Sequence, residues 1–411
     1  MNRGFSPIIL LSLLCHPLFC GEGRYLSLAS LLNAVRENHS LIDSSRKKEA
    51  SLDFTARSLG RKPNPELKLG YWLEPVETRA GAMQAKLAYS QALPPKSRLL
   101  QEKKVSLEEL TIQELQTSKL IQDLQRQVRD KFFEYNYLQR KAEILQENLK
   151  IVESFAKLWE THYSHHDYRY PRLIQLQTEI TQIQDQVREV EEMIPVVYEE
   201  LMTLSWKDSG KAMKTNFQQK VIEVDSKFES SRNIDLSILK ARLKKQQEKL
   251  KLAKTFFQPK KTAFMEYTGI DNNAPGSLSG QDAWMIGVGV ELVLDKNRVK
   301  QKVSANEKME EALELKILHK TRELQTQWKR ASYRVENARK KFQLCDSELI
   351  PRTREALEAL QINYSSQNKG MDFFALLDNL RKLLSLNLEK ELHFKEYFQA
   401  RAQQIRLLGR E

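Results

Sequence analysis

Leu93-Pro94-Pro95-Lys96-Ser97-Arg98 is followed, 200 positions later, by the similar stretch Val293-Leu294-Asp295-Lys296-Asn297-Arg298. Each stretch joins a segment of alternating apolar and polar residues to a long segment rich in Leu, Gln, Glu, Lys and Arg. Tyr163-Ser164 likewise recurs as Tyr364-Ser365, 201 positions later. Similarity at a fixed spacing indicates an internal repeat, so the sequence predicts a fold made of two related halves.

The composition is that of an ordered chain with a basic surplus. Of its 411 residues, 66 are Lys or Arg and 54 are Asp or Glu, which gives a formal net charge of +12. The 14 Gly and 12 Pro are far fewer than a disordered or collagen-like chain contains. Three cysteines, Cys15, Cys20 and Cys345, are too few for a disulfide scaffold or a Cys-rich zinc module.

Residues 1–21 have the pattern of an export signal. Arg3 supplies a basic start, and Ile8 to Leu14 form an apolar segment that is too short to span a bilayer. Cys20 leaves two alternatives open, lipidation of its thiol or simple cleavage of the chain near Gly21. No later segment reaches the ~18 uninterrupted apolar residues of a transmembrane helix. We therefore expect an exported protein without a conventional membrane helix.

The first predicted repeat covers residues 22–206. It opens with one helix from Leu26 to Arg61, for which Ser27 is the expected N-cap. Two alternating segments then predict a β-hairpin over 66–93, and a long helical hairpin follows over 98–206.

The second predicted repeat has the same order of elements. A polar and irregular linker over 207–232 precedes it, and the repeat itself covers 233–411. It contains a helix over 235–257, a β-hairpin over 261–294 and a helical hairpin over 298–408.

The helical hairpins are unusually long. The segment from Arg98 to about His162 lacks Pro and Gly, and ~65 helical residues at ~1.5 Å each reach roughly 100 Å. Pro195 and Pro351 lie inside predicted helices and should bend them. Helices of this length cannot fold onto a compact core, so we expect them to pack side by side.

Residues 283–294 form the clearest strand, because apolar side chains alternate there with small or polar ones. The four predicted strands have the length of tilted membrane-spanning strands. The residues expected to face lipid are Trp284, Ile286, Val288 and Val290, and those expected to face a lumen are Gly287, Gly289 and Glu291.

Four strands cannot close a barrel, and lipid does not tolerate open strand edges. If the strands enter a bilayer, several chains must share them, and three chains would supply about twelve strands. The alternative is a small soluble sheet that caps a coiled coil. On either interpretation the fold class is mainly α with a small β part.

The sequence resembles the TolC-like outer membrane efflux family over essentially its whole length after the signal. No single motif carries the resemblance, which lies in the order and duplication of several stretches. These are Leu26-Ser27-Leu28 with Ala34, Asn38, His39 and Leu41; the two stretches Gln91–Arg98 and Val293–Arg298; Ile350-Pro351 with Ala356, Leu357, Ala359, Leu360 and Tyr364; and Lys369-Gly370 with Leu376-Leu377-Asp378.

The resemblance implies a homotrimer with a twelve-stranded barrel in the outer membrane and a helical barrel across the periplasm. It further implies an exit duct for tripartite efflux or type I secretion, which works with a periplasmic adaptor and an inner membrane transporter and has no catalysis of its own. Asp378 falls on a position of the family's acidic ring at the periplasmic entrance, whereas Ala375 and Arg172 stand where other members of the ring would be. These differences weigh against a cation-binding entrance of the family's kind.

Other chemistries have weaker support. His162, His165 and His166 with Asp167 could bind a metal ion, but they span only six residues at a predicted turn, so we predict no metal site. No converging acid–base constellation or phosphate-binding Gly-rich loop is present, which argues against an enzyme and a cofactor. The Lys and Arg residues are spread along helices without interleaved aromatics, which disfavours nucleic acid binding.

The predicted function is therefore a trimeric outer membrane channel that opens by movement of its helical tips. The alternative is an exported coiled-coil scaffold or a periplasmic adaptor without a pore.

Overall fold

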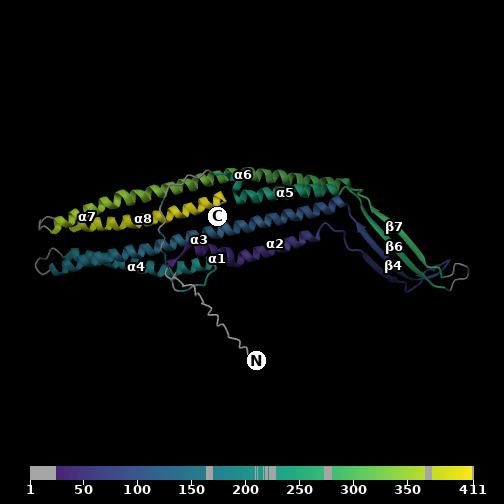
Figure 1. Ribbon diagram of the computed structural model, residues 1–411, viewed down its shortest axis with the longest axis horizontal. Coiled ribbons are helices and arrows are strands. Elements are labelled where there is room, and N and C mark those ends of the chain that lie inside the picture. Colours follow the sequence, from purple (N-terminus) through teal and green to yellow (C-terminus); the bar gives the residue numbers. More distant parts are fainter. Residues whose placement is uncertain are drawn as a thin grey trace, which may run out of the picture.

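The chain forms a long helical rod with a β-sheet at one end (Figure 1). The structure, a computed structural model, describes residues 25–162, 170–208, 228–272, 280–365 and 373–409, and some positions between 209 and 227. Most of the described chain is helical and only a small part is sheet, as the sequence predicts. The strands of both halves extend from the same end of the rod.

One antiparallel sheet contains strands from both halves of the chain. The strands pair in the order β2-β4-β6-β7, and the two-residue strand β3 pairs with β4. The hairpin of each half is joined to that of the other half by the ladder between β4 and β6. The strand bounds are β2 Glu66–Tyr71, β3 Glu77–Thr78, β4 Gly81–Leu93, β6 Lys260–Ile270 and β7 Ala283–Glu291.

Two helical paths run along most of the rod, α3 through its middle and α6 with α7 along one side (Figure 1). α3 has 67 residues, which corresponds to about 100 Å. It packs against α2 and α5 near the sheet and against α4 and α8 toward the other end. The bounds are α3 Lys96–His162, α4 Tyr170–Ser205, α5 Ile234–Thr255, α6 Lys296–Leu344, α7 Ile350–Ser365 and α8 Phe373–Leu408.

The largest apolar cluster lies near the middle of the rod. Val128, Phe132 and Tyr135 follow the spacing of one helical face on α3, and all three are almost completely buried. Tyr198 from α4 and Phe398 from α8 belong to the same cluster. This cluster therefore holds the two helical hairpins together.

The prediction of a single helix from Leu26 to Arg61 is wrong, because the chain breaks at His39. The His39 backbone is extended (φ −70°, ψ 119°), and its Nδ1 accepts a hydrogen bond from the N–H of Leu41 at 3.2 Å. This bond caps a new helix. Ser27 precedes the first helix but makes no capping bond with its side chain. The observed elements are β1 Tyr25–Leu26, α1 Leu28–Asn38 and α2 Ser40–Ser58.

Residues 207–232, predicted as an irregular linker, contain two short ordered elements among their described positions. β5 (Lys214–Thr215) pairs in parallel with β1, and Ser230–Arg232 form a short 3-10 turn. The hydroxyl of Tyr135 donates a hydrogen bond to the carbonyl oxygen of Met213 at 2.9 Å. Phe217 packs against the central cluster, with its ring 5.1 Å from that of Phe398. The segment between the halves thus contributes to the core.

A π-helical turn, Cys345–Leu349, interrupts the long path between α6 and α7. Pro351 lies one residue beyond Ile350 and has no N–H to donate, and its ring would clash with the carbonyl of residue 347 in a regular helix. The N–H of Ile350 instead donates to the carbonyl oxygen of Cys345, five residues back. The disturbance that the sequence predicts at Pro351 therefore takes the form of a π turn.

Candidate functional site

The register of the sheet places most of the large apolar side chains of the four long strands on one face. Directly paired residues in antiparallel strands share a face, and their side chains are neighbours. Two rows across the sheet are Leu67–Tyr89–Met265–Ile286 and Leu69–Leu87–Tyr267–Trp284.

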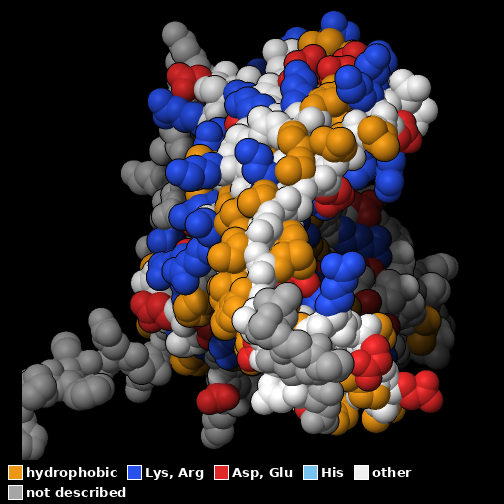
Figure 2. Space-filling model, turned by 90° about the vertical axis from the view of Figure 1, so that its right-hand side faces the viewer, with side chains coloured by type: hydrophobic (Ala, Val, Ile, Leu, Met, Phe, Trp, Pro, Cys, Tyr) orange, Lys and Arg blue, Asp and Glu red, His pale blue; other side chains and the backbone are white. Residues whose placement is uncertain are grey.

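This apolar sheet face is open to the surroundings of the chain. The exposed fraction is 80% for both Leu69 and Ile286 and 66% for both Trp284 and Val288. Val290, further along the same strand, is also exposed. Viewed from the sheet end, apolar side chains form a band across the molecule (Figure 2). A contiguous apolar surface of this kind is typical of a membrane or protein contact.

The opposite face of the sheet carries mainly small, polar and charged residues, together with Phe264 and Met285. Gly287 pairs with Phe264 on this face, and a Cβ atom added to Gly287 would overlap the Phe264 ring. Glu291 forms an ion pair with Lys260 at 3.1 Å. Gly289 lies on the same face, as do Lys86 and Glu266, which form an ion pair across β4 and β6 at 2.6 Å.

The end of the rod away from the sheet contains a charged link between the two helical hairpins. Arg381 of α8 donates from Nε and Nη2 to Oε2 of Glu179 on α4, at 3.0 Å and 2.5 Å. The same guanidinium lies 3.3 Å from Asp378, one turn earlier on α8. The hydrogen bonds that Arg381 donates to Glu179, together with the nearby carboxylates, raise the pKa of Arg381 further above its usual value. Sequence reasoning found Asp378 but missed Arg381 and Glu179, whose only signal is the i,i+3 spacing of Asp378 and Arg381.

Several residues from the sequence analysis lie where the structure gives no side-chain description. Arg172 is part of α4, but its side chain is not described. The same holds for His162 at the end of α3. Cys20 and the segment from His165 to Asp167 lie outside the described residues.

A group of possible metal ligands lies beside the π turn. The ligand atoms of Cys345, Glu389 and His393 lie within 4.8 Å of one another. Cys345 is buried, and burial raises the pKa of its thiol. His393 also contacts the carboxylate of Glu396 at 2.9 Å through Nδ1. Glu389 is exposed, and the carboxylate of Asp346 lies near the thiol together with the cationic side chains of Lys341 and Lys390.

Among the described helices, none has a stretch both long enough and apolar enough to cross a membrane.

No protein-family model matches the sequence, and neither does any curated protein. Solved structures, in contrast, match almost the whole chain. A membrane protein from Pseudomonas aeruginosa aligns with a TM-score of 0.77 and 13% identity, over 94% of this chain and 91% of that chain. The outer membrane channel MtrE of Neisseria gonorrhoeae, in its open state, gives a TM-score of 0.76 and 14% identity over 93% and 89%.

The outer membrane protein VceC of Vibrio cholerae aligns with a TM-score of 0.74 and 12% identity, over 93% of this chain and 96% of that chain. At such low identity the likeness shows the fold and nothing finer. The chain has the fold of TolC-like outer membrane channels, which confirms the resemblance at the level of structure.

Proposed function

We propose that the chain is one subunit of a homotrimeric outer membrane channel, the exit duct of an efflux pump or a secretion system. The exposed apolar sheet face carries this proposal, because a sheet with one apolar and one polar face is what a membrane-embedded channel wall requires. The outer membrane channels among the structural neighbours support it.

The strand directions support closure of the sheet by three chains. Successive strands are antiparallel, so β2 and β7, the two edges, run in opposite directions. The β7 edge of one chain can therefore pair with the β2 edge of the next in an antiparallel ladder. Four long strands from each of three chains make twelve, an even number within the range of outer membrane barrels. Closure would satisfy the backbone groups of both edges, which lipid cannot hydrogen-bond.

The two faces of the sheet then have different surroundings. Trp284, Ile286, Val288 and Val290 would contact outer membrane lipid. Gly287, Gly289 and Glu291, with the ion pair of Lys86 and Glu266, would line the lumen. Gly289 leaves room on the inner side of the wall, whereas the Phe264 ring fills the space beside Gly287.

The helical rod would continue the duct across the periplasm. About 100 Å of α3 is long enough to carry the far helical end away from the membrane. At that end, the contact between Arg381 and Glu179 joins the two helical hairpins of one chain. We infer that the duct opens when the hairpins separate there, and that a periplasmic adaptor and an inner membrane transporter meet the duct at this end. The energy for transport would come from that transporter, and the channel itself would catalyse no reaction.

The proposal is tested by reconstituting the purified, detergent-solubilised protein into planar lipid bilayers. We expect discrete single-channel currents and a band on unheated denaturing gels that shifts on boiling. A matched sample of the V288R variant, with a charge on the apolar sheet face, should insert less often. A water-soluble protein that produces no current would instead support the scaffold or the adaptor without a pore.

A further inference from the structure

The positive charge of the chain is concentrated where the sheet meets the helices. Segments 57–66, 94–104, 251–262 and 291–302 contain 15 Lys and Arg and only four Asp and Glu, a net charge of +11. The rest of the chain contains 51 basic and 50 acidic residues, a net charge of +1. Almost the whole surplus of +12 therefore lies in these four segments, which we call the basic collar.

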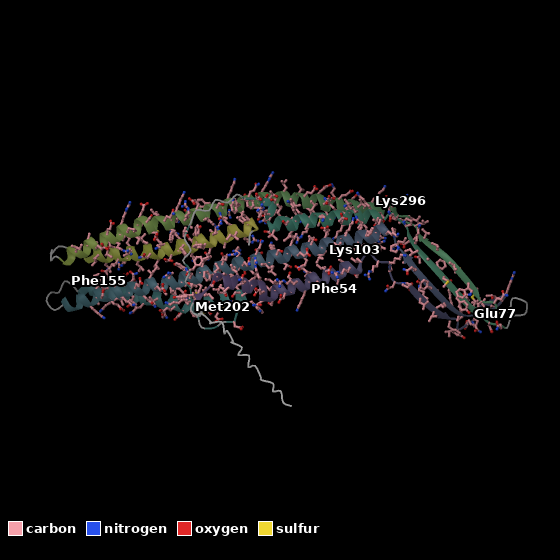
Figure 3. All side chains as sticks on the ribbon, viewed as in Figure 1. Phe54, Glu77, Lys103, Phe155, Met202 and Lys296 are labelled. Atoms are coloured by element: carbon pink, nitrogen blue, oxygen red, sulfur yellow. The ribbon has the colours of Figure 1, made fainter. Side chains whose placement is uncertain are left out.

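The fold gathers these four segments at one level of the molecule. Each joins a strand to a helix: α2 to β2, β4 to α3, α5 to β6, and β7 to α6. Figure 3 labels Lys296 where α6 meets the sheet and Lys103 a short way along α3 from the same end. Segments as far apart in the sequence as 57–66 and 291–302 thus form one belt next to the sheet.

The side chains of the basic collar are available to a partner. Each of its Lys and Arg residues is exposed except Arg98, which is half-buried. Arg98 from α3 and Lys302 from α6 both lie over the ring of Phe256, at 4.3 Å and 4.9 Å. These contacts hold cations from both halves close together. Ion pairs engage four of these cations, Arg57 with Asp53, Arg98 with Glu102, Lys251 with Glu248 and Lys260 with Glu291, so cations outnumber their acidic partners in the collar.

The basic collar continues directly from the apolar sheet face. Lys261 pairs with Val290, at the end of the apolar sheet face next to the helices. Leu292 and Leu294 follow the end of β7 along the chain and are 67% and 87% exposed. Viewed from the sheet end, Lys and Arg side chains lie along one side and at the top of the apolar band (Figure 2). Apolar surface bordered by long cationic side chains is the pattern of a membrane–water interface.

We propose that the basic collar binds the headgroups of anionic phospholipids in the leaflet next to the helical rod. The inference rests on the proposed channel function, which places the sheet in the bilayer. A leaflet with anionic lipids carries a negative surface potential, and juxtamembrane Lys and Arg residues are attracted to it within about a Debye length. The contact would fix the depth of the channel in the membrane. An acidic protein would be the other possible partner, but the collar borders the apolar sheet face, where headgroups and not soluble proteins are expected.

The test uses the full-length channel in nanodiscs of phosphatidylcholine, with or without phosphatidylglycerol, at low and high salt. The collar variant carries K261Q, K296Q, K300Q and K302Q. The control variant carries K316Q, K329Q, R352Q and R354Q, which remove four exposed charges on α6 and α7. Single-channel conductance of each protein is measured in the same lipids.

We expect phosphatidylglycerol to raise the Tm of the parent and of the control variant, and high salt to abolish this rise. The collar variant should need about tenfold more phosphatidylglycerol than the parent to reach half of the maximal increase in Tm. Equal Tm shifts in the collar variant and the parent would overturn the proposal. So would a shift produced by soluble polyglutamate and not by phosphatidylglycerol, because the collar would then be a protein contact. The conductance measurement separates this inference from the channel function. A collar variant that conducts normally but whose Tm no longer responds to phosphatidylglycerol supports both, whereas the channel function fails only if neither the parent nor the variants conduct.

Discussion

Gly287 is needed for the packing of its partner across the sheet. It pairs with Phe264, whose ring occupies the space that a side chain at position 287 would need. We expect G287A to lower the free energy of unfolding by about 1–3 kcal/mol through overpacking. G289A is the matched control, because the nearest atom to its new Cβ would be 3.9 Å away. Denaturant unfolding in detergent measures both, and F264A should reduce the effect of G287A. Equal stability of G287A and G289A would contradict this packing.

The V288R variant tests whether the apolar sheet face contacts lipid. A charge there should cost about 2–4 kcal/mol if the residue lies near the bilayer midplane. S90R is the control, because Ser90 lies on the opposite face at almost the same level of the sheet. Its neighbour Gln91 is in the row of paired residues that contains Val288. Folding into vesicles from urea measures the difference between V288R and S90R. If V288R folds as well as S90R, the two faces are assigned the wrong way round.

Asp130 predicts a pH dependence of stability. Burial raises its pKa from 3.8 to about 6, although Arg126 lies 2.6 Å away. The native state therefore binds this proton more tightly than the unfolded state does. Between about pH 4 and pH 6 the native state loses stability as the pH rises, by about 1–3 kcal/mol. D130N should remove this part of the pH profile of Tm, whereas D185N, at an exposed site, should keep it. An unchanged profile in D130N would show that Asp130 is not the group responsible.

The link between Arg381 and Glu179 operates at the scale of the elements, because it connects α8 to α4. Removing a hydrogen-bonded charge pair of this kind loses about 1–3 kcal/mol of the free energy that holds the hairpins together. We expect R381A to increase single-channel conductance. R352A is the control, because Arg352 is an exposed residue whose partner Glu348 lies in the adjoining turn. The combined variant E179R/R381E should restore the parent conductance if the pair itself keeps the helical end narrow. Parent-like conductance of R381A would exclude this role.

The elements differ in how far the sequence predicts them. Helix α3 and strand β7 are predicted well, because each has a sustained period, and periodicity reflects which side chains become buried or share a face. The break at His39 is missed, because apolar spacing continues on both sides of it. Pro351 predicts where the path of α6 and α7 is disturbed, at Cys345–Leu349. It does not predict that the disturbance is a π turn, since a proline can bend, kink or expand a helix.

At the scale of the whole molecule, we predict that three chains assemble into one particle. The chain has a mass of 48.0 kDa, so light scattering in detergent should give a protein mass of about three times that value, less any cleaved signal. Dissociation should require heating, because three chains would share one closed set of strand hydrogen bonds. The N–H of Trp72 donates inward to Gln84, so the N–H groups of Leu67, Leu69 and Tyr71 point to the open edge of β2. L69P, which removes one of these outward N–H groups, should weaken the assembly, whereas G210P, outside the strands and helices, should not. A monomer with a stable sheet would contradict closure of the wall by three chains.

The sequence by itself determined the periodic elements, their duplication, the two faces of strand β7 and the resemblance to TolC-like channels, since these depend on residues that are near in the chain. Only the tertiary structure decided how the two hairpins join through β4 and β6, and that part of the segment 207–232 enters the core. It also decided that Arg381 meets Glu179, and that fifteen cations from four segments form one collar. Such contacts connect residues up to about two hundred positions apart, and no local period encodes which distant partner a side chain will meet.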